Sequence, residues 1–343
     1  MDLSTLVKMS NTYGSNPAYV LAGGGNTSVK NDTTLYVKGS GTQLATIKAE
    51  GFVKMDRARL NEIMKTEYPK NDVEREAAYL ADVMAAVTDD DKTKRPSVEA
   101  LLHNLFAYTY VLHVHPTLVN GLTCGQGAQA LCEQLLGKDV LWVDTFKPGY
   151  TLARICYEKM NAYKEEFGKD VQVLLLQNHG IFVAADTVEE IGVLFDGVIN
   201  KLEKQVKRTA DVSDAVTPEK EQAAQQLSEL LGHAVEVVPA AEADNFVKDR
   251  AAAAPLLKPF TPDHIVYCGP YPLFVEKIER AKEALDAFMA ENDKEPRLIL
   301  VQGVGAFIME DDKGKAAKAQ LLIKEAIKLA ENPESFGGPL QMT

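Results

Sequence analysis

Two histidines separated by one residue, His113 and His115, lie in an apolar stretch, residues 110–116. In a β-strand, residues i and i+2 project from the same face, so both imidazoles can bind one cation. A third histidine, His179, follows another apolar stretch and precedes a glycine. Three neutral imidazoles bind Zn²⁺ and leave a fourth position open, which is typical of catalytic sites. The sequence therefore predicts a divalent metal site, and two histidines on a surface strand are the alternative for the first pair.

One carboxylate, that of Glu99, lies 14 residues before His113. The pattern Pro-Ser-Val-Glu predicts a helix that opens at Pro96, since proline and an acidic side chain both suit a first turn. Near a metal, Glu99 could act as a general base or as a fourth ligand, whereas elsewhere it would only favour the helix dipole. His103 lies one turn later, where it either supports Glu99 or simply packs.

Two glycine-rich turns, residues 23–28 and 38–41, are candidates for anion binding. They offer backbone N–H groups, hydroxyls, an amide and the ammonium of Lys38, and such concave arrangements suit a phosphate. Neither turn matches the Walker A pattern or the GxGxxG pattern of dinucleotide sites. Ordinary hairpin turns are the alternative.

Short strands joined by tight turns predict an antiparallel sheet in the first part of the chain. Helices are expected where apolar residues recur at helical spacing, and buried strands where short apolar runs end at turn residues. Residues 29–37 are expected to form a hairpin that turns at Asn31 and Asp32. The other expected strands span residues 52–55, 110–116, 171–176, 181–184 and 298–301, and the expected helices include 57–87, 188–208 and 272–292.

A length of 343 residues favours two domains over one. The composition becomes polar at residues 210–221, which places the boundary between a first domain, residues 1–210, and a C-terminal α/β unit, residues 211–343. A weak internal repeat links the two, because residues 173–183 align with residues 298–308 at four identical positions. Val304 stands where His179 stands in the first copy, so the C-terminal unit is expected to be a degenerate copy, if the repeat is genuine.

Acidic residues outnumber basic ones by 49 to 37, and the net charge is −12. This charge makes nucleic acid and anionic membranes poor candidates for partners. No apolar run approaches the ~20 residues that span a bilayer, and the first residues lack the features of a signal peptide. The four cysteines form no CxxC pair. A cytoplasmic protein that acts on a small molecule is expected.

Together these segments resemble the class II aldolase/adducin family. The matching stretches are GGGNTSVK (residues 23–30), LYVKGSGTQLA (35–45), PSVEALLH (96–103), HVHP (113–116) and LLQNHGIFV (175–183). The similarity is greatest to the aldolase part of bifunctional rhamnulose-1-phosphate aldolase/alcohol dehydrogenases, whose C-terminal aldolase segments match TPDHIVY and PRLILVQGVGAF. The dehydrogenase part of those proteins has no counterpart in these 343 residues.

The resemblance implies an α/β fold with a central, mainly antiparallel sheet flanked by helices, assembled as a homo-oligomer (a tetramer or a dimer). It implies Zn²⁺, or another divalent metal, on His113, His115 and His179, with Glu99 as the catalytic acid/base. A neighbouring subunit of such proteins supplies a tyrosine as proton donor, whose match is not identifiable here. Val98 departs from the family pattern, which has a second hydroxyl there. The implied phosphate ligands are Asn26, Ser28, Ser40, Gly41 and Ser97, to which the second glycine-rich turn adds Lys38.

The activity implied is that of an aldehyde-lyase of rhamnulose- or fuculose-phosphate type. It would cleave a ketose 1-phosphate to dihydroxyacetone phosphate and a short aldehyde through a metal-stabilised enediolate. A sugar-phosphate 4-epimerase, a decarboxylase or a dehydratase could use the same site. A non-catalytic, adducin-like module is the further alternative.

Overall fold

The computed structural model describes residues 1–331 and 333–342, and it divides into two compact units. The first comprises Met1–Val119 and Gln129–Lys204, and the second comprises Asn120–Ala128 and the chain from Gln205 onward. Each unit combines a sheet with helices, so the α/β class expected from the sequence is confirmed. Nothing in the sequence predicted that Asn120–Ala128 would group with the C-terminal residues.

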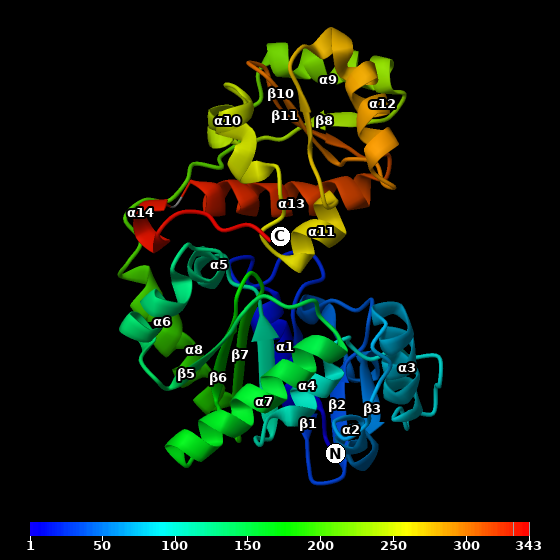
Figure 1. The fold of residues 1–343 in the computed structure, drawn as a ribbon, viewed down its shortest axis with the longest axis vertical. Helices are drawn as coiled ribbons and strands as arrows, with labels where there is room; N and C mark the ends of the chain where they lie inside the picture. The colour runs from blue at the N-terminus through cyan, green and yellow to red at the C-terminus, as the bar shows by residue number, and fades with distance from the viewer. Residues whose placement is uncertain (332, 343) are drawn as a thin grey trace. The chain divides into compact units, whose positions relative to one another are not determined.

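A seven-stranded sheet forms the centre of the first unit, in the order β3-β2-β1-β4-β7-β6-β5 (Figure 1). Neighbouring strands in this sheet are antiparallel except β5 and β6, which confirms the mainly antiparallel sheet expected. The strands are β1 (Asn26–Lys30), β2 (Thr34–Lys38), β3 (Phe52–Asp56), β4 (Tyr110–Val114), β5 (Val140–Val143), β6 (Val173–Leu176) and β7 (Gly180–Ala185).

The helices of this unit include two where the sequence predicted one helix over residues 57–87. That prediction was wrong because Pro69 cannot continue a helix, and Asn71 caps a new one by accepting from the N–H groups of Val73 and Glu74. The helices are α1 (Ser4–Gly14), α2 (Arg57–Ile63), α3 (Asp72–Ala85), α4 (Ala100–Leu105), α6 (Ala128–Leu136), α7 (Tyr150–Phe167) and α8 (Val188–Glu203), with 3₁₀ turns at Leu44–Thr46 and Ala49–Gly51. α5 (Thr117–Thr123) begins in this unit and ends in the second.

The two faces of the sheet are covered by different helices. α4 and α7 cross the face that is turned to the viewer in Figure 1. α1 lies on the opposite face, where Ser10 is hydrogen-bonded to Thr27 of β1 at 2.7 Å. α8 lies beside α1, since the rings of Tyr13 and Phe195 are in edge contact at 5.2 Å. Alternate residues of β1 therefore face α4 and α1 in turn.

A four-stranded sheet, in the order β8-β11-β10-β9, forms the centre of the second unit. Its strands are β8 (Val235–Val237), β9 (Leu273–Val275), β10 (Leu298–Val301) and β11 (Gly305–Met309). β9 begins inside the helix expected over residues 272–292, which starts only at Ala281. The helices are α9 (Pro218–Leu231), α10 (Arg250–Ala253), α11 (Pro262–Cys268), α12 (Ala281–Glu291), α13 (Lys313–Ala330) and α14 (Pro333–Phe336), with 3₁₀ turns at Ala241–Phe246, Ala254–Leu256 and Ile278–Arg280.

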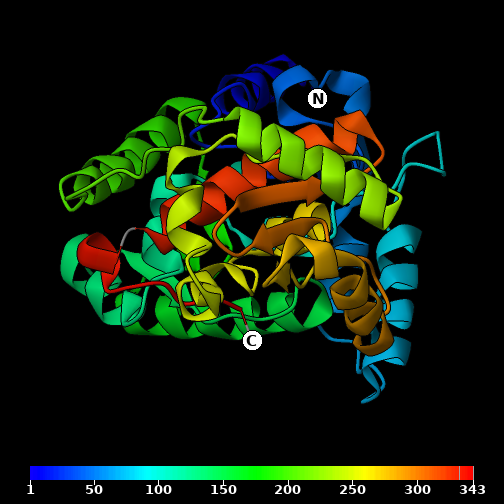
Figure 2. The ribbon, with the colours of Figure 1, turned by 90° about the horizontal axis from the view of Figure 1, so that it is seen from above.

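Helices also cover both faces of this second sheet. α9 and α12 pack on one face, where their apolar side chains share a core with Ile299, Val301, Phe307 and Met309. α13 packs against β11, and seen from above the strands β10 and β11 run side by side across it (Figure 2). Among the described residues of both units, no helix combines the length and the apolar character needed to cross a membrane.

The strand pairing of the second sheet repeats that of β4-β7-β6-β5 in the first. In the first sheet, β6 and β7 form an antiparallel hairpin and β5 pairs with β6 in parallel; in the second sheet, β10 and β11 form the hairpin and β9 pairs with β10 in parallel. The two hairpins have the same register, because Leu176 lies opposite Gly180 and Val301 lies opposite Gly305. The N–H of Gln177 donates to β5 and the N–H of Gln302 donates to β9, both at 2.8 Å. This shared pairing supports the repeat that the sequence suggested.

The second unit has valines at the positions that correspond to His113 and His179. Val237 pairs with Phe307 as His113 pairs with Phe182, and Val304 occupies the position of His179 in the hairpin turn. Beside that turn lies Lys220, whose Cε would be 3.5 Å from a Cβ on Gly305, and whose ammonium forms an ion pair with Asp244 at 2.7 Å. The side chain of Lys220 therefore lies beside the hairpin of β10 and β11.

The buried histidine of α11 provides a test of the second unit. His264 is fully buried, accepts from the hydroxyl of Thr261 at Nδ1 and donates to Leu322 O, and burial lowers its pKa to about 4. In the unfolded chain its pKa is about 6.5, so the unfolded state gains the proton first and stability falls as the pH falls from 6.5 towards 4. We expect His264→Gln to reduce this slope by up to about 1.4 kcal/mol per pH unit.

Urea unfolding at pH 7 and pH 5, on the wild type and on this variant, measures the difference. His233→Gln is the matched control, because His233 is partly exposed. An identical loss of stability in the wild type and in His264→Gln would contradict this interpretation.

Candidate metal centre and active site

The structure brings the three predicted imidazoles together. His113 lies in β4, His115 follows that strand, and His179 lies in the turn between β6 and β7. One ring nitrogen of each lies within 4.8 Å of the others, and the Nε2 atoms of His113 and His115 are 2.9 Å apart. Three nitrogen donors at this spacing match a metal site with an open coordination position.

His113 is held in the form that a metal ligand requires. Its Nδ1–H donates to the carbonyl of Ile181 at 2.9 Å, so the lone pair of Nε2 faces the other two histidines. Its ring stacks on Phe182 with 3.8 Å between centroids. The side chain is fully buried, and burial, followed by the neighbouring His115 and His179, holds its pKa well below the usual range. The ring is therefore neutral at neutral pH.

The turn that carries His179 is fixed by its neighbours. Asn178 has a positive φ of 56°, a conformation that asparagine tolerates better than most residues. Its side-chain oxygen accepts from the hydroxyl of Thr145 at 2.6 Å, and the N–H of Gln177 donates to Val143 O at 2.8 Å. These contacts hold the turn against β5 and set the direction of His179.

Gly180 permits the close approach of β7 to the end of β4. A Cβ at this position would lie 2.6 Å from Val114 O and 2.7 Å from Cδ2 of His115. Both distances are shorter than any real contact of a methyl group, so a side chain here would displace the strand or the imidazole. The glycine after His179 is therefore required by the geometry of His115.

Glu99 completes the cluster. Its carboxylate places Oε2 at 3.3 Å from His113 Nε2 and Oε1 at 3.4 Å from His179 Nε2, and it is only 6% exposed. The expected helix start was wrong, because α4 begins at Ala100 with Glu99 as its N-cap residue. Pro96 instead forms a bridge with Gly39, which ties the segment before Glu99 to the second glycine-rich turn.

Three alternate residues of β1 face α4 and bind it. Asn26 Nδ2 donates to Glu99 Oε2 at 2.7 Å and to Ser97 Oγ at 3.1 Å. Ser28 is hydrogen-bonded to His103, and the ammonium of Lys30 donates to the carbonyl of His103 at 2.9 Å. Burial, followed by a nearby guanidinium, lowers the pKa of Lys30 to about 7. Sequence reasoning passed over Lys30, although its place two residues after Ser28 was a usable signal.

The remaining predicted phosphate ligands lie around the second glycine-rich turn. Ser97 N donates to Lys38 O at 3.0 Å, so this turn runs beside the segment that leads to Glu99. Lys38 Nζ lies 3.5 Å from the carbonyl of Gly23, which joins the two turns. Ser40 and Gly41 are exposed, and Gly41 has a φ of +84°. The turn thus presents the hydroxyl of Ser40 to solvent, whereas the N–H groups of Gly39 and Ser40 donate to the carbonyls of Gly51 and Arg95.

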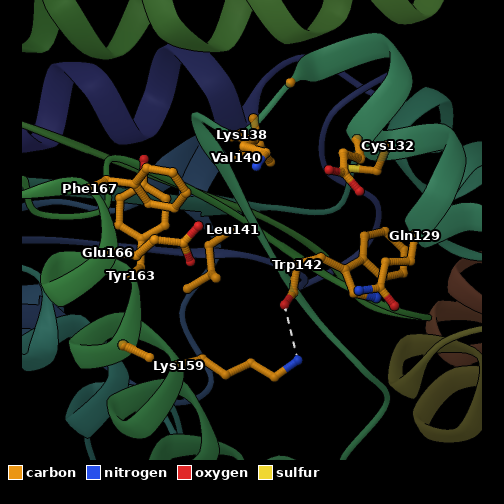
Figure 3. A pocket seen from close by; sticks show the side chains of 13 residues that line it. Gln129, Cys132, Lys138, Val140, Leu141, Trp142, Lys159, Tyr163, Glu166 and Phe167 are labelled. Atoms are coloured by element: carbon orange, nitrogen blue, oxygen red, sulfur yellow. Dashed lines mark hydrogen bonds between the residues drawn. The ribbon is translucent and has the colours of Figure 1, made fainter.

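A separate cavity of about 380 Å³ lies between α6, β5 and α7, as Figure 3 shows. Aromatic side chains of Trp142, Tyr163 and Phe167 line it, and the ammonium of Lys159 donates to the carbonyl of Trp142 at 3.3 Å. None of the predicted site residues lines this cavity. Both acidic and basic side chains line the cavity, so their charge does not indicate which class of ligand would bind there.

The close approach at Gly180 can be tested directly. We expect Gly180→Ala to lower the affinity for Co²⁺ by about 10-fold or more, because the methyl group would push the ring of His115 out of the cluster. The visible absorption of bound Co²⁺ measures that affinity. Gly197→Ala is the matched control, since no atom lies within 4 Å of its added Cβ in α8. Equal affinities in the two variants would contradict the packing argument.

Comparisons with known proteins agree with this architecture. The family model described as "Class II Aldolase and Adducin N-terminal domain" matches residues 5–196. A curated relative, the uncharacterized oxidoreductase YuxG of Bacillus subtilis (strain 168), is 23% identical over 384 aligned positions. That alignment covers 97% of this chain and 54% of YuxG, so the chain spans about half the length of this relative.

Two solved structures are similar to the first unit. The N-terminal class II aldolase domain of a conserved protein from Thermoplasma acidophilum is 27% identical, with a TM-score of 0.51 over 60% of this chain and 93% of that one. L-fuculose-1-phosphate aldolase from Thermus thermophilus is 15% identical, with a TM-score of 0.37 over 59% and 93% of the two chains. The second likeness is too slight to bear on activity. The family match covers more than half of the chain and contains every predicted site residue, so this chain belongs to the class II aldolase and adducin family.

Proposed function

We propose that this chain is a metal-dependent aldehyde-lyase that cleaves a ketose 1-phosphate to dihydroxyacetone phosphate and a short aldehyde. The convergence of His113, His115, His179 and Glu99 carries this proposal. Membership of the family supports the reaction class. The name of the longer relative, an oxidoreductase, supports the resemblance to the aldolase part of bifunctional proteins. The sugar itself and assembly as a homo-oligomer are part of the proposal.

The donor set suits Zn²⁺. Neutral imidazoles are good ligands for this ion, and burial keeps His113 neutral. Bound by His113, His115 and His179, the metal would supply a Lewis acid that stabilises negative charge on the oxygen atoms of the substrate. Glu99 is close enough to two of these rings to share the site with a substrate bound there.

Glu99 is the general acid/base in this proposal. It would move the proton at C3 of the substrate or at the C3 hydroxyl, for which it must lie within hydrogen-bonding reach of the reacting atoms. The hydrogen bond from Asn26 keeps the carboxylate in one place. A fixed carboxylate loses little entropy when the substrate reacts.

The phosphate is assigned to the second glycine-rich turn and the residues beside it. Lys38 would supply an ammonium, Ser40 a hydroxyl and Gly41 a backbone N–H, and Ser97 adds a hydroxyl next to Glu99. Asn26 joins Ser97 to the carboxylate of Glu99 through its amide. Ser28 is buried and hydrogen-bonded to His103, so it would support the site without touching the phosphate. Val98 is 64% exposed and offers no hydroxyl, which narrows the set of phosphate ligands.

Removing one imidazole tests the metal assignment. We expect His113→Ala to lose both bound metal and the release of dihydroxyacetone phosphate, because two nitrogen donors hold a divalent ion far less tightly than three. Elemental analysis gives the metal content, and a coupled assay with glycerol-3-phosphate dehydrogenase gives the rate. His233→Ala, in the second unit, is the matched control and should leave both unchanged. Activity that survives both chelation and His113→Ala would refute the proposal.

Neutralising the carboxylate tests the acid/base assignment. We expect Glu99→Gln to keep the metal and to lower the rate by about 10²-fold or more, since general acid–base catalysis typically contributes 10²–10⁴-fold. Glu158→Gln, on the exposed side of α7, is the control for the same chemical change. A rate near that of the wild type would remove Glu99 from the mechanism.

Mass spectrometry of the products from a panel of sugar phosphates distinguishes cleavage from epimerisation, decarboxylation and dehydration.

A further inference from the structure

The ring of His103 lies fully buried between β1 and α4, one helical turn after Glu99. Its Nδ1 is hydrogen-bonded to the hydroxyl of Ser28 at 2.7 Å, and its Nε2 is hydrogen-bonded to Oδ1 of Asn26. Both ring nitrogens therefore have partners on β1. These partners satisfy both ring nitrogens, as burial requires, and one of them is the residue that binds the carboxylate of Glu99.

The arrangement of donors determines which ring nitrogen carries the proton. A carboxylate only accepts hydrogen bonds, so the group of Asn26 that faces Glu99 must be its NH₂. The oxygen of the same amide then faces His103 and requires a donor there. Nε2 of His103 must therefore be protonated, and Nδ1 accepts the hydroxyl hydrogen of Ser28. Each group in the chain fixes the orientation of the next.

Without this donor, the amide of Asn26 could rotate. A half-turn about its side-chain bond would place Oδ1 against the carboxylate of Glu99, where two acceptors repel each other. The same turn would direct the NH₂ group at His103 and away from Ser97. The backbone of α4 is held separately, since the ammonium of Lys30 donates to the carbonyl of His103. Loss of the ring donor should thus affect the amide more than the helix.

We propose that His103 is a positioning residue, whose Nε2–H fixes the amide of Asn26 and thereby the carboxylate of Glu99 relative to the three imidazoles. His103 acts through Asn26 and has no contact with the metal cluster in this role. The catalytic consequence rests on the proposed function of the site, whereas the orientation of the amide does not.

The position of the proton can be measured without any assay of activity. Long-range ¹⁵N NMR of the histidine rings, on the full chain with Zn²⁺ added, distinguishes a protonated ring nitrogen from an unprotonated one. The resonances of His103 are those that disappear in His103→Asn and in His103→Gln. We expect the proton on Nε2 of His103 at neutral pH. A proton on Nδ1 with none on Nε2 would overturn the proposal.

Two substitutions separate positioning from packing. Glutamine at residue 103 can extend an amide N–H to about the place of Nε2 and reach Asn26, whereas asparagine reaches only about as far as Nδ1 and Ser28. We expect His103→Asn to lower kcat by about 10²-fold, with KM and Co²⁺ affinity within about 3-fold of the wild type. His103→Gln should recover at least 10-fold of that loss. Equal rates in the two variants, at comparable thermal stability, would contradict the proposal.

The side-chain amide of Asn26 gives a second measurement that is independent of turnover. Its NH₂ protons are buried between two acceptors, so they should exchange slowly with solvent in the wild type and in His103→Gln, and at least 10-fold faster in His103→Asn. If no sugar phosphate is cleaved by the wild type, the proposed function fails while these NMR results still decide the role of His103. Equally slow exchange in all three proteins would refute that role.

Discussion

The contact between β1 and α4 determines where the carboxylate of the site lies. Asn26, Ser28 and Lys30 project from one face of the strand, and each binds a different part of the helix: the carboxylate of its N-cap residue, the ring of His103 and the carbonyl of that same residue. All these groups are buried, where an unpaired polar group is costly. The helix cannot slide along the strand without breaking several hydrogen bonds at once. A short helix of six residues therefore becomes a rigid support for Glu99.

The second half of the site depends on how closely β7 approaches β4. The hairpin turn places His179 beside His113 of β4 and His115, which follows that strand, only because Gly180 leaves room for the ring of His115. The left-handed Asn178 and its hydrogen bond to Thr145 hold the turn in place. The carboxylate thus comes from the start of α4, and the imidazoles come from the end of β4 and from the turn between β6 and β7. A buried carboxylate beside neutral rings is an environment in which a divalent cation is strongly stabilised.

The second unit has the same strand pairing as the first but has valines at two of the histidine positions. Its hairpin keeps the register, the glycine and the hydrogen bond to the parallel neighbouring strand, yet the histidine positions carry Val237 and Val304. The alkyl chain of Lys220, whose ammonium pairs with Asp244, lies beside its hairpin glycine, where the first unit has an imidazole. The sheet therefore does not require a metal for its pairing. The three imidazoles of the first unit are therefore not needed for the strand pairing that the two units share.

The sequence by itself predicted the α/β class, the antiparallel sheet and the histidines that form the cluster, because alternation in strands and the type of side chain are local properties. It also identified Glu99, but it began α4 at Pro96 and joined α2 to α3, since local patterns do not reveal that Pro96 pairs with Gly39 or that a new cap forms at Asn71. Only the tertiary structure decided the role of His103. Its partners lie 75 and 77 residues away in the chain, and a hydrogen bond over that distance depends on how the strand and helix pack.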